Sequence, residues 1–168
     1  MSELTIRPVT ADDLGAVNDI YNEAVRTTVA TFDVEPRTME ERRVWFAGHG
    51  PRHPVLAAQC GGSVVGWASL SKWSDRGAYA DTVEVSLYVA EGHRGRGIGR
   101  RLLEAVIEEG RRAGLHAVIA QIVGGNEVSI HLHRAMGFEH VGVLREVGRK
   151  FGRLLDVCIM QKVYGDER

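Results

Sequence analysis

The chain has 168 residues, of which 44% are hydrophobic and 26% charged, and its formal net charge is −1. This length suits one domain, residues 1–168, with a sizeable core, and the near-neutral charge gives no support for nucleic acid or an anionic membrane as a partner. No apolar run approaches transmembrane length, and the first ten residues lack the apolar segment of a signal peptide. Cys60 and Cys158 lie far apart and show no metal or redox spacing, so we expect both to be small core residues. We therefore expect a cytoplasmic protein without a metal site.

Two capping boxes predict helices in the first part of the chain, after a short strand at residues 4–7. Thr10 stands three residues before Asp13, and Thr38 stands three residues before Glu41. Apolar residues recur at helical spacing after the first box, so that helix should end near residues 26–28. The apolar connection at residues 29–32 is either a lid over a pocket or a loop that packs on the core.

Alternation and glycine turns predict the strands that follow. Gly61-Gly62 is a hairpin signal, and residues 82–89 alternate between apolar and polar side chains. The run at 117–123 is almost wholly apolar, as in a central strand covered on both faces. Gly114 should end the preceding helix, and Asn126 should cap a helix that reaches about residue 136. The expected strands are residues 55–59, 64–70, 82–89, 117–123, 141–147 and 155–163.

A glycine-rich turn joins the strand at 82–89 to the next helix. Its sequence is Arg94-Gly95-Arg96-Gly97-Ile98-Gly99. Glycines allow the backbone to approach a ligand closely, and the first N–H groups of a helix attract phosphate. A Walker loop would need a Lys-Ser/Thr pair here, and a Rossmann fingerprint would need glycine at Arg100. The spacing that fits, Arg-x-x-Gly-x-Gly, resembles the acetyl-CoA pyrophosphate loop of the GNAT N-acetyltransferases. An ordinary glycine-rich turn is the alternative.

The order of the elements agrees with this resemblance. It reads β-α-α-β-β-β-α-β-α-β-β, which predicts an α+β fold with a single twisted mixed β-sheet flanked by helices. This is the order of the GNAT fold.

Longer motifs resemble one group within that superfamily, the phosphinothricin and methionine sulfone–methionine sulfoximine N-acetyltransferases. The resemblance covers nearly the whole chain. One departure is Trp73-Ser74-Asp75-Arg76, where some similar enzymes have Trp-Arg-Pro-Phe, so the choice among these substrates stays open. The motifs are Ile20-Tyr21-Asn22, Thr31-Phe32, Glu35-Pro36, Arg43, Trp45-Phe46, Trp73 to Val89 with gaps, Ser129-x-x-x-His133-x-x-x-Gly137-Phe138, and Lys150-x-Gly152-x-x-x-Asp156-Val157.

The resemblance implies an acetyl-CoA-dependent transfer to the α-amino group of a small amino acid, catalysed by a homodimer. Glu84, on the polar face of the strand before the loop, is the expected general base, directly or through a water. His133 is expected to act as a modest acid, as a second base or only in packing. Arg145, Arg149, Lys150 and Arg153 form a basic stretch that is either a solvated face or, in a dimer, a cover for the neighbour's pocket.

The resemblance also implies two sets of binding residues. An arginine such as Arg76 is suited to pairing with a substrate carboxylate. The expected cofactor-binding residues are Leu87, Tyr88, Val89, Arg94, Gly95, Arg96, Gly97, Ile98, Gly99, Arg100, Asn126 and Ser129. The expected substrate-binding residues are Phe32, Trp73, Ser74, Asp75, Arg76, Tyr79, Glu84, Val85 and Ser86.

Two other functions remain open at this point. One is a non-catalytic acyl-CoA sensor, which would keep the loop without the chemistry. The other is an acetyltransferase whose acceptor is a protein N-terminus or a lysine, which would need an open peptide groove.

Overall fold

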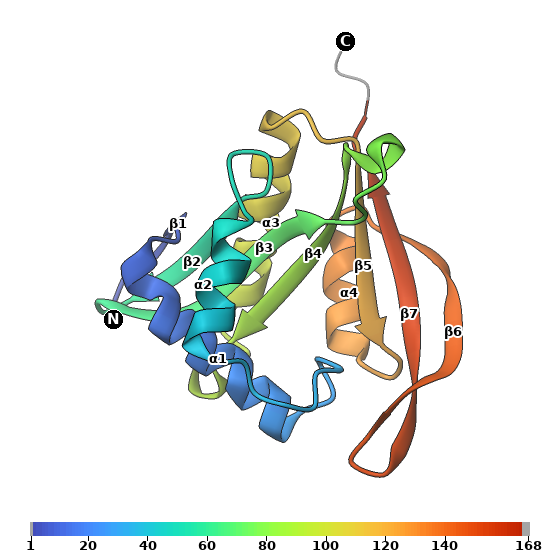
Figure 1. Ribbon diagram of the computed structural model, residues 1–168, viewed down its shortest axis with the longest axis horizontal. Coiled ribbons are helices and arrows are strands. Elements are labelled where there is room, and N and C mark those ends of the chain that lie inside the picture. The colour runs from blue at the N-terminus through green and yellow to red at the C-terminus, as the bar shows by residue number, and fades with distance from the viewer. Residues whose placement is uncertain (1, 166–168) are drawn as a thin grey trace.

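A computed structural model describes residues 2–165 and shows a seven-stranded mixed sheet in the order β1-β2-β3-β4-β5-β7-β6 (Figure 1). The succession of strands and long helices along the chain confirms the predicted order and the α+β class. The last two strands are longer than the sequence predicted. The strands are β1 Leu4–Pro8, β2 Val55–Cys60, β3 Ser63–Lys72, β4 Thr82–Val89, β5 Ala117–Val123, β6 Glu139–Lys150 and β7 Arg153–Val163.

Helices cover both faces of this sheet. α1 (Leu14–Thr27) and α2 (Met39–Ala47) lie on one face, over a cluster that includes Trp67. α3 (Ile98–Arg112) and α4 (Glu127–Ala135) lie on the other, over the larger apolar core. The Thr38 capping box forms with both of its hydrogen bonds, and the Asn126 side chain caps α4 by accepting from the Ser129 N–H. In the described part of the chain, no helix is long and apolar enough to cross a membrane.

The middle of the sheet divides between β4 and β5. These strands are parallel and pair at only three positions, from Thr82 with Ala117 to Glu84 with Ile119. Beyond Glu84 they diverge, as the green and ochre strands of Figure 1 show, and β5 pairs along its whole length with β7 instead. The second half of β4 therefore has a strand partner only on its β3 side.

The connection between α1 and α2 is held in place from two directions. Asn22 of α1 exchanges two hydrogen bonds with the backbone of Arg37, at 2.8 and 2.9 Å. From the β6–β7 hairpin, the Lys150 ammonium donates to the backbone oxygen of Thr31 at 2.8 Å. The connection is thus a loop held in place by hydrogen bonds at both ends, and its residues line cavities next to the sheet.

Three expectations about burial were wrong. Lys150 is buried, unlike Arg145, Arg149 and Arg153, which are exposed as a solvated basic face should be. Gln121 is exposed within β5, because the divergence from β4 uncovers one side of that strand. Cys60 is only half-buried, although Cys158 lies in the core as expected.

Two helical glycines should respond in opposite ways to alanine. A Cβ on Gly110 of α3 would overlap the Tyr164 hydroxyl and approach Leu70 Cδ1 to 2.7 Å, whereas a Cβ on Gly15 of α1 meets nothing within 4 Å. Overpacking of this kind costs about 1–3 kcal/mol, and glycine within a helix is roughly 0.5–1 kcal/mol less favourable than alanine. Gly110→Ala should therefore lower the free energy of unfolding and Gly15→Ala should raise it, as measured by urea denaturation. Equal stability of the two variants would contradict the packing described for α3.

Candidate active site

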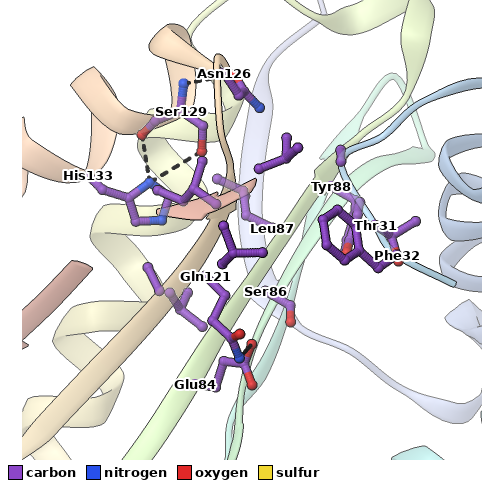
Figure 2. A pocket seen from close by; sticks show the side chains of 16 residues that line it. Thr31, Phe32, Glu84, Ser86, Leu87, Tyr88, Gln121, Asn126, Ser129 and His133 are labelled. Atoms are coloured by element: carbon purple, nitrogen blue, oxygen red, sulfur yellow. Dashed lines mark hydrogen bonds between the residues drawn. The ribbon is translucent and has the colours of Figure 1, made fainter. Parts of the chain in front are cut away.

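A cavity of about 310 Å³ opens where β4 and β5 diverge (Figure 2). β4 and β5 supply two of its walls, the α1–α2 connection supplies a third, and α4 supplies the fourth. The lining residues are Ala30, Thr31, Phe32, Glu84, Val85, Ser86, Leu87, Tyr88, Ala120, Gln121, Ile122, Val123, Asn126, Ser129, His133 and Val157.

Glu84 is placed at the point of divergence because it is the last β4 residue that pairs with β5. Its side chain is half-buried, and its Oε1 accepts a hydrogen bond of 3.1 Å from the Gln121 amide. Burial raises the pKa of the Glu84 carboxyl, and the bond from Gln121 offsets part of this effect. A carboxylate with a raised pKa is a better proton acceptor near neutral pH than an ordinary surface glutamate.

His133 lies on α4 and is almost fully buried, at 4% exposure. Its Nδ1 is 2.7 Å from the Ser129 backbone oxygen, which can only accept, so Nδ1 carries the proton. Burial lowers the pKa of His133, although the bond to Ser129 opposes this, so the neutral form of the ring is favoured. Nε2 then carries a lone pair. This arrangement favours a proton acceptor or an orienting group and does not suit a charged acid.

A second cavity, of about 470 Å³, continues from the first toward the glycine-rich turn. Both cavities are lined by Ala30, Leu87, Tyr88, Val123 and Asn126, so they form one path along the divergence. Arg94 lines its far end and donates from Nε to the Val89 backbone oxygen at 3.0 Å.

The turn at the end of this path has the geometry of an anion site. Gly95 and Gly97 have φ angles of 76° and 79°, a region that favours glycine, and Gly97 is the N-cap of α3. An added Cβ on either glycine would meet nothing within 4 Å, so their backbone is open to a ligand. The free N–H groups of the first turn of α3 are suited to bind a diphosphate. The unpaired side of β4 is suited to pair with the amides of an arm attached to that diphosphate. These residues therefore fit the coenzyme that the sequence suggested.

The structure brings many of the predicted site residues together and leaves others apart. Phe32, Glu84, Val85, Ser86, Leu87, Tyr88, Asn126, Ser129 and His133 all line the first cavity. The segment Trp73 to Tyr79 lines neither cavity, and Arg76 is exposed. A role for that segment in substrate binding stays a prediction that requires a rearrangement or a second subunit.

Sequence reasoning missed two polar residues at this site. Gln121 donates a hydrogen bond to Glu84. It is the one polar residue in an otherwise apolar strand, and this was the only feature of the sequence that could have drawn attention to it. Thr31 appeared within a motif but was given no role. Within residues 2–165, no group of three His, Cys, Asp or Glu side chains is arranged to hold a metal ion.

Comparison with known proteins agrees with this geometry. A family model described as the acetyltransferase (GNAT) family matches residues 17–138. The chain belongs to the GNAT acetyltransferase family. Its members of known structure include one with acetyl-CoA bound, a phosphinothricin acetyltransferase from Sinorhizobium meliloti, which has a TM-score of 0.94 and 37% identity and covers 97% of this chain and 89% of that one.

Two further relatives of this GNAT protein differ in the acceptor that their names state. The L-methionine sulfoximine/L-methionine sulfone acetyltransferase of Pseudomonas paraeruginosa is 42% identical over 159 residues, which are 94% of this chain and 92% of that protein. A structure described as ribosomal-protein-alanine N-acetyltransferase from Brucella melitensis has a TM-score of 0.92 and 43% identity, and covers 95% of this chain and 99% of that one. The family and the enzymatic class are therefore shared, while the acceptor has to be argued from the site.

The raised pKa of Glu84 has a consequence for stability. A carboxyl that binds its proton more tightly in the folded state destabilises the fold once it is ionised, above its ordinary pKa of 4.5 and increasingly up to the raised value. Glu84→Gln should therefore unfold at a higher urea concentration than the wild type at pH 7–8, and this difference should shrink as the pH falls through the raised pKa toward 4.5. Glu104→Gln, on the exposed side of α3, is the matched control. If Glu84→Gln raised the urea concentration needed for unfolding by the same amount at pH 4 and pH 8, Glu84 would not be desolvated in the folded protein.

Proposed function

We propose that this GNAT protein transfers the acetyl group of acetyl-CoA to the α-amino group of a small amino acid or analogue, such as phosphinothricin, methionine sulfoximine or methionine sulfone. One observation carries the proposal: the half-buried Glu84 carboxylate lies in a cavity that continues into the path leading to the glycine-rich turn. The names of the relatives support the same acceptor class.

The proposed reaction is direct attack of the amine on the thioester carbonyl. The α-amino group of a free amino acid is largely protonated at neutral pH, so Glu84 accepts a proton, directly or through a water, before the nitrogen attacks. A C–N bond forms, the C–S bond breaks, and the attacking nitrogen gives up its second proton, which the leaving CoA thiolate takes up. Backbone N–H groups on the unpaired side of β4 are suited to stabilise the oxyanion that develops on the carbonyl.

In this proposal His133 has a supporting role. Its side chain lines the cavity from α4, and its Nδ1 bond to Ser129 fixes the ring. It orients the thioester or takes a proton during the reaction. Asn126, Ser129 and the β4 residues Leu87, Tyr88 and Val89 are proposed to contact the pantetheine arm, and Arg94 to Arg100 to surround the diphosphate.

A protein acceptor is the second candidate, because of the name of the Brucella melitensis structure. The geometry favours the small acceptor. The α1–α2 connection, fixed by Lys150, forms one wall of the cavity, which leaves less room for a peptide than for a free amino acid. A non-catalytic sensor is less well supported, since such a protein has no use for a desolvated carboxylate beside the thioester site.

Assembly as a homodimer is proposed from the β6–β7 hairpin. β6 is an edge strand, and several large apolar side chains on this hairpin are exposed, which is unfavourable for an isolated subunit. These side chains are Val141, Val143, Leu144, Val147, Phe151 and Leu154.

A charged residue introduced among these exposed apolar side chains should therefore dissociate the dimer. We expect the wild type to sediment as a dimer in analytical ultracentrifugation and Val147→Glu, at a position with 56% exposure, to sediment as a monomer. Val44→Glu, at the exposed Val44 of α2, is the control and should leave the sedimentation unchanged. A monomeric wild type would refute the proposed assembly.

Glu84→Gln should lower kcat by roughly 10²–10⁴-fold, the range ascribed to general-base catalysis, because glutamine cannot accept the proton. The Kd for acetyl-CoA should change little, since the path to the glycine-rich turn is untouched. A thiol-release assay with phosphinothricin, methionine sulfone and methionine sulfoximine measures kcat, and calorimetry measures the Kd.

The same experiment separates the candidate functions. Turnover of a peptide with an N-terminal alanine in preference to all three small amines would favour the protein acceptor. Tight binding of CoA without any acetyl transfer would favour the sensor. A Glu84→Gln variant with wild-type kcat would remove Glu84 from the mechanism.

A further inference from the structure

A third cavity, of about 340 Å³, lies between α1, α2 and the sheet, next to the candidate active site. Ser86 and Tyr88 line both this cavity and the one that contains Glu84, so the two spaces adjoin across β4. Ser86 stands two residues beyond Glu84 on the same face of the strand, and Figure 2 shows its hydroxyl between Glu84 and Tyr88. The lining residues are Tyr21, Asp33, Arg37, Glu41, Arg42, Trp45, Trp67, Ser86 and Tyr88.

Arg42 is the unusual member of this set. It is 4% exposed, and its guanidinium lies over the rings of three aromatic residues at 4.7–5.6 Å, Trp45 being the nearest and Trp67 the farthest. Its Nε donates to the Asn18 side chain at 3.1 Å. Across residues 2–165, neither of its terminal nitrogens has a hydrogen-bond acceptor and no carboxylate pairs with it. A buried cation that lacks a counter-charge is costly, and burial lowers the pKa of Arg42 accordingly.

The two carboxylates that line the cavity are already engaged. Asp33 pairs with Arg37 at 3.0 Å and also accepts from the Tyr21 hydroxyl. Glu41 accepts from the Thr38 backbone N–H at 2.8 Å, as part of the cap of α2. Asp33 thus compensates the charge of Arg37, and Glu41 compensates the partial positive charge at the start of α2. The positive charge of Arg42 is left without a carboxylate partner in the cavity.

Two more buried polar groups on β3 also lack partners. The Trp67 indole N–H and the Ser69 hydroxyl make no hydrogen bond within the described chain, and both residues are at most 2% exposed. Trp67 lines the cavity, and Ser69 is the direct cross-strand neighbour of Ser86. Buried donors without acceptors are uncommon and point to a missing ligand atom. Arginine, an indole N–H and a hydroxyl together match oxygen atoms that carry negative charge.

We propose that the Arg42 cavity receives the far end of the acceptor's side chain, and that this end carries acceptor oxygens, as a phosphinate, sulfone, sulfoximine or carboxylate does. The inference rests on the proposed amino-acid acetyltransferase function and specifies its acceptor. With the amine at Glu84, the side chain passes Ser86, roughly 7 Å along the strand, which is a span that an amino acid the size of methionine can cover. Arg42 then acts as a specificity residue that touches the acceptor away from the reacting atoms.

The test compares three acceptors in two variants. Arg42→Gln should raise KM for phosphinothricin, whose end group is anionic, by about 10–100-fold, the loss expected when a charge-assisted hydrogen bond is removed. The rise should be smaller for methionine sulfone and absent for norleucine, which has no such oxygens, and kcat should hardly change. Arg43→Gln, the same change at the exposed neighbour on α2, should alter none of these values. An equal loss for all three amines would mean that Arg42 only supports the fold.

A second measurement covers the case in which Arg42→Gln folds poorly. Phosphinothricin titrated into the wild type should shift the indole N–H resonance of Trp67, identified as the signal that disappears in Trp67→Phe. The titration needs no turnover, so it separates the two proposals. A shift in a protein that acetylates none of the amines would leave the subsite standing and the function refuted. Turnover of the amines without a shift of the Trp67 resonance would overturn the subsite but not the proposed function. An Arg42→Gln variant whose KM rises equally for all three amines would have the same meaning.

Discussion

The structure depends on the early end of pairing between β4 and β5. Parallel strands within a sheet normally satisfy each other's backbone groups along their whole length, and an unpaired strand invites a foreign strand. Here the pairing stops at Glu84, and the free side of β4 faces a cavity instead of bulk solvent. An extended ligand with its own amides can occupy such a position as an added strand would. The same break in the sheet borders the half-buried Glu84 carboxylate and leads to the glycine-rich turn, so one departure from regular pairing gives rise to both the proposed binding path and the proposed catalytic position.

The two titratable groups beside this path are shifted toward their neutral forms by the same cause. Burial raises the pKa of Glu84 and lowers the pKa of His133, because each loses the water that stabilises its charged form. Their hydrogen bonds differ in what they fix. Gln121 donates to Glu84 and partly stabilises its charge, whereas Ser129 accepts from His133 and fixes the tautomer. Burial and a hydrogen bond thus act in opposition on the proton affinity of both groups, and in His133 the bond also fixes the orientation of the ring.

Local patterns predicted the elements well because their causes are local. The capping boxes at Thr10 and Thr38, the Gly61-Gly62 turn and the alternation of β4 each depend on neighbours in sequence. The burial of Lys150 could not be predicted in this way, since its partner Thr31 is 119 residues away and its sequence neighbours Arg149 and Phe151 are exposed. The exposure of Gln121 likewise follows from where a different strand diverges. The roles assigned to residues 73–79 came from resemblance alone, and the cavities of a single chain do not include them.

The loop between α1 and α2 connects the site of the proposed chemistry to the proposed acceptor subsite. Its first part, with Thr31 and Phe32, borders the cavity of Glu84, and its second part, with Asp33 and Arg37, borders the cavity of Arg42. Gly148 of β6 packs so closely on the Phe32 ring that a Cβ there would overlap it. Together with the bond from Lys150, this contact holds the loop against the β6–β7 hairpin. Under the proposed function, an acceptor would have to fit against this fixed wall, which suits a short molecule with polar groups at both ends better than a peptide.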